Sequence, residues 1–504
     1  MTVGQEQEIE LKFSVPQEAI ANIASHPAIV AIQSKPATNR HFRTTYFDTP
    51  VLALRTQGSI LRVRHDIRHN TTIQTIKMPE AAPKATAISP RREWEWKISG
   101  ETPDTDVVRT AGIHALLPEG ALEALTPIFT GDIHRTEILL APPGGLVELA
   151  IDHGELRSGA SVSPVCEIEL ELKEGPRTLI YDTALALCAA GLPLRISTIS
   201  KARRGFSLAM ATPLAAPLVL PPPALLENMP AGQAFRMLAA ANLSLILSNM
   251  ESALDGRDIE GVHQMRLALR RLRSIFSFFH PILPRDVLPD IRTGLKHMTQ
   301  VLGPERDLDV FIAETLPRLS GEKPPALLMQ RARTRQKAMH AKTEALLKDT
   351  ATTIILLKTC RFLEDERCMK KEAQRSLSTC APAWLDKMHA KILHAGRHFS
   401  HLPEKELHSL RTRIKKLNMA IAATQTLFAS PEAERFALAA STLGKALGRY
   451  NNACFARDML KKLAGKGKPP ALLANRLAQQ LATLREKDAP EAWKTFKTTR
   501  PYWE

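Results

Sequence analysis

Residues Glu8-Ile9-Glu10-Leu11-Lys12 and Glu167-Ile168-Glu169-Leu170-Glu171-Leu172-Lys173 nearly repeat each other within the first two hundred positions of the chain. Each stretch alternates charged and aliphatic residues, a period of two that is typical of a strand with one polar and one apolar face. Either row alone is equally typical of a solvated strand face. Two acidic rows in one domain repel each other, so we expect positive charge between them, from basic side chains or a divalent cation.

The same alternation recurs between the two acidic stretches. It places charged residues of both signs on one face of further segments, namely Arg62 and Arg64, Thr75 and Lys77, Arg91, Glu93 and Glu95, and Glu148 and Asp152. Such strands can close into a barrel with a polar lumen, which also removes exposed sheet edges. Trp94 and Trp96 alternate with Glu93 and Glu95, so we expect them on the outer, packed face. A lumen of Lys, Arg and a few carboxylates favours a polyanion that enters with its metal.

Residues 1–210 resemble the CYTH superfamily, the triphosphate tunnel metalloenzymes. The resemblance rests on ordered segments: Glu8, Glu10 and Lys12; Tyr46-Phe47-Asp48-Thr49; Arg62 and Arg64; Lys77; Arg135; Glu167-Ile168-Glu169-Leu170-Glu171; and Ser200-Lys201-Ala202-Arg203-Arg204-Gly205. It implies an α+β chain that begins with an eight-stranded antiparallel β tunnel and flanking helices. It also implies an inorganic triphosphatase that uses Mg²⁺ or Mn²⁺.

Roles for the site residues follow from this resemblance and from side-chain chemistry. Phosphate oxygens would be held by the basic residues Lys12, Arg62, Arg64, Lys77, Arg135 and Lys201. The metal ligands would be Glu10, Glu167 and Glu169, with Glu8 and Asp152 as further ligands. One metal would orient the triphosphate, and a second, as the family implies, would activate the attacking water. Phosphoryl transfer depends mainly on positioning and charge stabilisation, and we expect Glu10, Glu169 and Lys201 to be catalytic.

Residues 211–231 divide the chain. They include six prolines, which break helices and central strands, so we predict a Pro-rich linker there. Its apolar residues are too interrupted to span a membrane. The formal net charge is −3 up to residue 231 and +19 beyond it. The basic second half therefore predicts a polyanionic partner.

Residues 232–504 show helical periodicity and an internal repeat. The stretch from His263 to Leu272 recurs from His408 to Leu417, and Leu302-Gly303 recurs as Leu447-Gly448. Both recurrences have an offset of 145 residues, which predicts a duplicated helical unit spanning about 240–385 and 386–504.

Each copy of this repeat carries a basic stripe and a separate apolar stripe on one helix. The basic stripes are His263, Arg266, Arg270 and Arg273 in the first copy, and His408, Arg411, Lys415 and Asn418 in the second. The apolar stripes are Met265, Leu269, Leu272, Phe276 and Phe279, and Leu410, Ile414, Leu417 and Ile421. A solvated basic face usually interleaves acids, and these stripes hold none.

This half resembles the CHAD domain, a helical module rich in histidines and basic residues. The resemblance implies two similar helical bundles related by a pseudo-twofold axis, which bind inorganic polyphosphate through their basic stripes. The first copy fits well and includes Arg306-Asp307-Leu308-Asp309. The second copy departs from it, because Asn451-Asn452 takes the place of Arg306-Asp307 and Asn418 takes the place of Arg273.

The remaining signals concern location and alternatives. The six cysteines form no CxxC pair and the N-terminal residues show no secretory signal, so we expect a reduced, cytoplasmic protein that can associate with polyphosphate granules. No His-rich tract or HExxH motif indicates a histidine metal site. The same tunnel also suits an adenylate cyclase, a thiamine triphosphate or nucleoside triphosphate hydrolase, or a non-catalytic polyphosphate scaffold. Nucleic-acid binding is disfavoured by the lack of aromatic platforms, and no membrane partner is expected.

Overall fold

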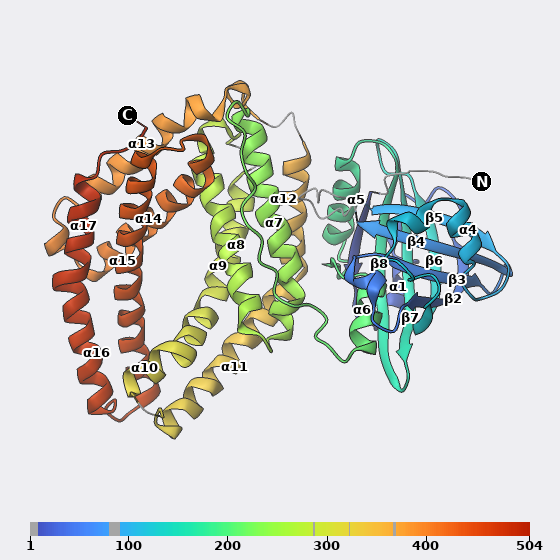
Figure 1. The fold of residues 1–504 in the computed structure, drawn as a ribbon, viewed down its shortest axis with the longest axis horizontal. Helices are drawn as coiled ribbons and strands as arrows, with labels where there is room; N and C mark the ends of the chain where they lie inside the picture. The colour runs from blue at the N-terminus through green and yellow to red at the C-terminus, as the bar shows by residue number, and fades with distance from the viewer. Residues whose placement is uncertain (1–8, 80–90, 286–287, 322, 366–368, 504) are drawn as a thin grey trace. The chain divides into compact units, whose positions relative to one another are not determined.

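The computed structural model describes residues 9–79, 91–285, 288–321, 323–365 and 369–503. The chain forms two compact units (Figure 1). The sheet unit comprises residues 1–216 and 347–365, and the helical unit comprises residues 217–346 and 366–504.

The sheet unit is built on an antiparallel sheet of nine strands in the order β5-β4-β3-β2-β6-β7-β8-β1-β9. The strands are β1 (Glu10–Ser14), β2 (Thr38–Asp48), β3 (Ile60–Asp66), β4 (Thr71–Pro79), β5 (Arg91–Ile98), β6 (Thr126–Leu140), β7 (Leu146–Ser158), β8 (Ser161–Glu174) and β9 (Arg195–Ile196). Its helices are α1 (Ile20–Ile23), α2 (Pro27–Val30), α3 (Ala53–Thr56), α4 (Thr105–Thr110), α5 (Thr178–Ala189), α6 (Lys201–Ala209) and α12 (Thr350–Glu364). The antiparallel sheet with helices confirms the predicted fold class, and the two-residue β9 is added to the predicted eight strands.

Alternation along the strands sends apolar side chains to the outer face and charged ones to the concave face. Leu61, Val63 and Ile76 lie in a buried outer cluster with residues of α4, and Trp94 and Trp96 pack against this cluster as predicted. The apolar residues therefore fix which face of each strand is buried, and the charged residues between them are forced to the opposite face.

The two ends of the sheet differ from the closed barrel that the sequence suggests. Within the described ranges, no hydrogen-bonded pairing joins β5 to β9. One end is instead capped by α12, because the backbone N–H of Ile196 in β9 donates to the Thr353 hydroxyl at 3.2 Å. The same helix packs on α5, where Arg361 pairs with Asp182. A helix over an edge strand satisfies backbone groups that would otherwise attract another chain.

We expect the substitution Thr353→Val to lower the free energy of unfolding of the sheet unit by about 1–3 kcal/mol, because the buried N–H of Ile196 loses its acceptor. Urea titration with hydrogen exchange at β1 and β9 measures the effect. Thr359→Val is the matched control: Thr359 is equally buried, but among the described residues its hydroxyl bonds the Ile355 carbonyl of its own helix and no group of another element. Equal destabilisation by both variants would contradict a specific role for α12 at this edge.

The helical unit contains the remaining helices, which confirms the predicted all-α second half. They are α7 (Ala231–Asp255), α8 (Ile259–Phe278), α9 (Leu288–Val310), α10 (Leu316–Ser320), α11 (Ala326–Lys348), α13 (Leu377–Ala395), α14 (Glu404–Thr424), α15 (Pro431–Ala464), α16 (Ala471–Thr483) and α17 (Ala489–Thr498). The two predicted apolar stripes are buried, with Leu269 on α8 and Ile414 on α14 both at 0% exposure. The repeat-bearing helices α8 and α14 pack against each other, as do α8 and α9, and α14 and α15.

Two further features of the helical unit bear on the sequence predictions. Residues 217–229 form no helix or strand, and Leu218 is tied to α7 through both of its backbone groups, which bond the Asn249 side chain at 2.9 and 3.0 Å. Helix α7 is long and apolar enough to cross a membrane by length and composition. Because 67% of its most apolar window is buried inside the structure, packing within the helical unit accounts for its apolar character.

Candidate active site

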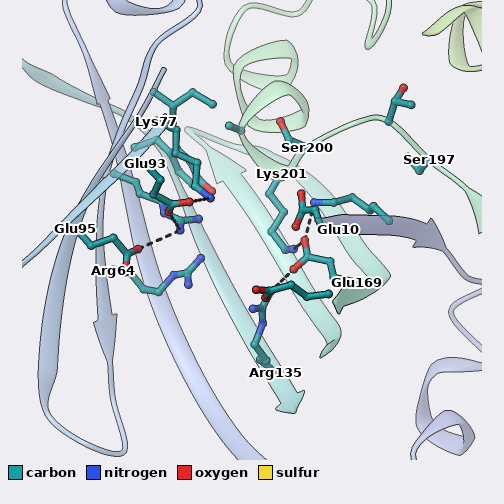
Figure 2. Close-up of a pocket in the computed structure, with 17 residues that line it drawn as sticks. Glu10, Arg64, Lys77, Glu93, Glu95, Arg135, Glu169, Ser197, Ser200 and Lys201 are labelled. Carbon is teal, nitrogen blue, oxygen red and sulfur yellow. Dashed lines mark hydrogen bonds and ion pairs between the residues drawn. The ribbon is translucent and has the colours of Figure 1, made fainter. Parts of the chain in front are cut away.

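The concave face of the sheet encloses a cavity of about 300 Å³ (Figure 2). Side chains from β3, β4 and β5 point into it from one side, and side chains from β1, β8 and the start of α6 point into it from the other. The polar residues that line it are Glu10, Lys12, Tyr46, Arg62, Arg64, Lys77, Glu93, Glu95, Arg135, Glu169, Glu171, Ser197, Thr198, Ser200 and Lys201. The sequence pattern of two acidic strands with basic strands between them therefore describes one cavity.

Three carboxylates converge at one wall of this cavity, where Glu169 lines it and Asp152 and Glu167 lie buried beside Glu169. Asp152, Glu167 and Glu169 each offer an oxygen, and these atoms lie within 4.8 Å of one another. Register explains the convergence: Asp152 on β7 stands directly opposite Glu167 on β8, and Glu169 follows two residues along the same face. Asp152 and Glu167 are 0% and 1% exposed, so their charges depend on partners inside the protein.

Two lysines provide those partners. The Lys201 ammonium lies 2.6 Å from Asp152 Oδ2 and 3.1 Å from Glu169 Oε1, and it also contacts Glu167. The Lys12 ammonium donates to Glu169 Oε1 at 2.6 Å. Lys201 is the first residue of α6, whose N-terminus is capped by the Ser200 hydroxyl, which accepts from the Arg203 N–H. The helix start that opens the Ser-Lys-Ala-Arg motif thus faces the cavity, where free N–H groups favour anions.

Arg135 completes the acidic wall. Its Nε donates to Asp152 Oδ1 at 2.7 Å, and its Nη2 donates to Glu169 Oε2 at 2.6 Å. Burial alone would raise the pKa of Glu169, but Lys12, Lys201 and Arg135 hold it well below the usual value. Burial alone would lower the pKa of Lys12, but Glu169, Glu167 and Glu10 raise it. Lys201 and Arg135 likewise lower the pKa of Asp152 against its burial, so Asp152 and Glu169 are ionised at neutral pH.

The opposite wall is basic and less completely paired. Lys77 lies 2.5 Å from Glu93, and Arg62 lies 3.6 Å from the same residue. Arg64 stacks on the Phe42 ring at 4.8 Å, and no partner is recorded for its buried Nε among the described residues. Burial and the charges of Arg62 and Arg135 lower the pKa of Arg64 to about 10. Asp152 and Tyr46 offset this effect only in part, and Arg64 forms no ion pair among the described residues.

The carboxylate group has the donor chemistry of a hard divalent cation. Asp152, Glu167 and Glu169 supply only oxygen ligands, the type that Mg²⁺ and Mn²⁺ prefer. The buried Oε2 of Glu167 has no hydrogen-bond partner in the described part of the chain, and a cation would satisfy it. These residues therefore fit a metal-ligating site.

The structure places the predicted site residues as follows. All six predicted phosphate ligands line the cavity, and so does Glu10. Glu10 stands opposite Glu171 in the β1–β8 register, outside the group formed by Asp152, Glu167 and Glu169. Glu8 and the Arg91 side chain lie outside the described residues.

Some lining residues had weaker signals in the sequence. Glu171 belongs to the second acidic stretch but has no role assigned from the sequence, yet it lines the cavity beside Glu10. Arg204 was part of the α6 motif without an assigned role, and its Nη2 lies 3.6 Å from Glu167 Oε2. Period-two alternation with Glu169 would have placed Glu171 on the cavity face, whereas the contact of Arg204 depends on how α6 packs.

The helical unit contains a second cluster of charge, formed by Arg266 and Arg270 on α8 and Arg411 and Lys415 on α14. Asp307 on α9 is the acidic neighbour of this cluster; Arg266 lies 3.4 Å from it. Burial and the charges of Arg270, Arg411 and Arg266 lower the pKa of Lys415 to about 6. We call these four residues the basic cluster; it is an electrostatically strained arrangement that an anion would relieve.

The other predicted stripe residues lie around this cluster. The pKa of His263 is lowered by burial and by nearby Arg306. In the second copy of the repeat, Asn451 Oδ1 accepts from His408 Nδ1 at 2.5 Å, and Asn418 donates to the Ala440 carbonyl at 3.1 Å. Arg273 lines a separate cavity with Arg292, Lys296 and Lys416. Asn451 and Asn418 thus form hydrogen bonds within the fold at the positions where the first copy has the charged residues Arg306 and Arg273.

Comparison with known proteins divides the chain in the same way. A curated relative, the inorganic triphosphatase of Haemophilus influenzae, is 29% identical over 203 residues, which are 40% of this chain and 55% of that protein. The chain thus matches little more than half the length of this relative.

Solved structures resemble each half. The CHAD domain of Ricinus communis has a TM-score of 0.48 at 23% identity, over 56% of this chain and 98% of that one. A candidate adenylyl cyclase from Hippeastrum, described as having a dominant triphosphatase activity, has a TM-score of 0.30 at 20% identity, over 40% and 95%. The CYTH family model matches residues 6–206 and the CHAD family model matches residues 237–461. The chain therefore contains a CYTH domain followed by a CHAD domain.

Proposed function

We propose that the sheet unit is a metal-dependent inorganic triphosphatase, which cleaves tripolyphosphate to diphosphate and phosphate. The observation that carries the proposal is the cavity itself. A basic wall of Arg62, Arg64 and Lys77 faces Glu169 across the cavity, and the carboxylates of Asp152 and Glu167 converge with that of Glu169. A phosphate chain needs the first wall and its divalent cation needs the second.

The protein groups in this scheme act by position and charge. Arg62, Arg64 and Lys77 bind oxygens of the chain, with arginine able to make paired contacts. Lys12, Lys201 and Arg135 keep Glu169 ionised and offset the charge that develops on the leaving group. A metal held by Asp152, Glu167 and Glu169 would supply charge neutralisation and activation of the attacking water.

The composition of the cavity supports an inorganic substrate over an organic triphosphate. Tyr46 is the aromatic residue that lines it within the described chain, and the apolar lining is confined to Ile60 and Ala202. A nucleotide base or a thiamine ring gains most of its binding energy from aromatic and apolar surfaces, which this cavity offers in small amount.

We expect kcat/KM for tripolyphosphate to exceed that for ATP and for thiamine triphosphate, measured by phosphate release with Mg²⁺ or Mn²⁺. Faster turnover of either organic substrate would replace this assignment.

We also propose that the helical unit binds longer inorganic polyphosphate at the basic cluster. The four cations of this cluster come from two copies of one repeat. Among the described residues, Asp307 is the one acidic side chain that offsets their charge. A linear polyanion would relieve the mutual repulsion of these cations, and its affinity should fall with salt as bound counterions are released. The predicted pseudo-twofold arrangement of the two repeats remains part of this proposal.

We expect polyphosphate binding to take up protons near pH 7.5, because Lys415 has a pKa of about 6 in the free protein and the bound anion would raise it. Affinity should therefore increase by up to about tenfold per pH unit as pH falls from 8 toward 6, and level off below 6. Calorimetry in two buffers of different ionisation enthalpy, without divalent metal, measures the protons taken up.

Lys415→Met should remove most of this pH dependence. The matched control is Lys405→Met, on the exposed first turn of the same helix, which should preserve it. An unchanged pH slope in Lys415→Met would show that another group takes up the proton.

A further inference from the structure

We propose that His41, Asp132 and His134 form a second metal site on the outer face of the sheet, which takes a transition metal of the Zn²⁺ and Co²⁺ class. One ligand atom from each of the three residues lies within 4.8 Å of the others. His41 Nε2 is 2.7 Å from Asp132 Oδ1, and the rings of His41 and His134 stack with centroids 4.0 Å apart. The proposal is independent of the triphosphatase assignment.

Strand register creates this group from residues that are distant in the sequence. His41 on β2 stands directly opposite His134 on β6, which in turn stands opposite His153 on β7. Directly opposite residues in antiparallel strands have Cβ atoms about 5 Å apart, close enough for two imidazoles to share one ion. The ring of His153 lies 5.2 Å from that of His134 and provides a further imidazole beside the site.

The site lies on the opposite face of the sheet from the cavity. His134 precedes Arg135 and His153 follows Asp152, and both of these neighbours belong to the acidic wall. Because successive side chains of a strand point to opposite faces, the histidines must point outward. His41 and Asp132 are 26% and 43% exposed, so an ion can reach them from solvent.

The donor set separates this site from the carboxylate group in the cavity. Two imidazole nitrogens and one carboxylate oxygen are the ligands of many zinc sites, which leave a fourth position for water. Hard cations such as Mg²⁺ prefer the all-oxygen group of Asp152, Glu167 and Glu169. Ligand atoms around a tetrahedral ion with bonds of about 2.1 Å lie about 3.4 Å apart, so a rotation of the exposed His134 side chain would bring the set together.

The surroundings of His134 favour its neutral imidazole, the form that binds metals. Partial burial and the neighbouring His41 and His153 lower the pKa of His134, with Arg68 acting in the same direction and Asp132 opposing it. A bound ion would tie β2 to β6 directly behind Arg135. The expected consequence is a stiffer acidic wall, seen as higher thermal stability of the sheet unit.

The test uses the chelator-stripped full chain titrated with Co²⁺ in excess Mg²⁺, which occupies the oxygen sites. We expect one equivalent of Co²⁺ to bind with a visible absorption spectrum of nitrogen ligation. His134→Asn should weaken this binding at least tenfold, because one imidazole ligand is lost, whereas the substitution Glu169→Gln in the cavity should leave it unchanged. His134 is exposed, so this variant is expected to fold normally.

The matched control is His114→Asn, an exposed histidine outside the group, which should bind Co²⁺ as the native chain does. Equal binding by His134→Asn and the native chain would overturn the proposal. Loss of Co²⁺ binding in Glu169→Gln would also overturn it, because the ion would then be bound in the cavity. Untagged native protein should also be retained on a Ni²⁺ resin longer than His134→Asn, and equal retention would count against the site.

Discussion

Glu169→Gln should lower the rate of phosphate release from tripolyphosphate by roughly a hundred- to a thousandfold, the loss expected when one preorganised charge is removed from a catalytic site. Glu169 is the carboxylate that contacts Lys12, Lys201 and Arg135 together, at 2.6, 3.1 and 2.6 Å. Glutamine has the same size but no charge, so the three cations would lose their shared partner. The rate is measured at saturating Mg²⁺ or Mn²⁺.

The neighbouring residue Glu171 provides the matched control for this substitution. It lies two positions further along the same strand and lines the same cavity, but its recorded ion pair is with Lys173, at 2.7 Å, and both side chains are partly exposed. Because an exposed pair is worth at most about 1 kcal/mol, Glu171→Gln should change the rate by less than about fivefold. If both variants lost the same amount of activity, the rate would depend on the total negative charge of the cavity and not on the particular contacts of Glu169.

The dependence of activity on metal concentration gives a second test with the variants Glu169→Gln and Glu171→Gln. If Asp152, Glu167 and Glu169 hold the divalent cation, Glu169→Gln should raise the Mn²⁺ concentration needed for half-maximal activity, while Glu171→Gln should not. A normal Mn²⁺ requirement with a slow rate would assign Glu169 to the ordering of Lys12 and Lys201 alone.

The sequence predicted this cavity because period-two alternation fixes the face on which each charged side chain lies. Lys12, Arg62, Lys77 and Glu169 could therefore be assigned to one lumen without knowledge of the strand order. Alternation does not determine which residues stand opposite one another. Glu10 was predicted as a metal ligand beside Glu169, but the register pairs Glu10 with Glu171 and Lys12 with Glu169.

Contacts between distant segments were beyond the reach of sequence patterns for the same reason. Helix α12 lies within the CHAD match at residues 237–461, and its buried apolar residues do not indicate which core it joins. The Thr353 hydroxyl and Arg361 place it with β9 and α5 in the sheet unit. The cross-strand pair of His41 and His134 is likewise a product of register, since neither position belongs to a local histidine motif.

Arg64→Met should weaken tripolyphosphate binding and stabilise the free protein at the same time. The buried Nε of Arg64 has no recorded hydrogen-bond partner in the described structure, and nearby Arg62 and Arg135 oppose its charge. Methionine would retain the apolar stem over Phe42 and remove that repulsion, which is expected to raise stability by about 1 kcal/mol. Loss of a charged hydrogen-bond donor to phosphate should raise KM for tripolyphosphate roughly 10- to 100-fold.

The gain in stability and the loss of substrate affinity have opposite signs. This combination is expected only of a residue whose charge destabilises the free protein and binds an anion. Arg92→Met is the matched control, because Arg92 alternates with the cavity residue Glu93 and is exposed on the outer face. It should change neither KM nor the melting temperature. If Arg64→Met instead lowered the melting temperature and left KM unchanged, Arg64 would serve the packing of the sheet. A gain in stability with a loss of affinity would mean that the fold bears an unfavourable charge that the substrate neutralises.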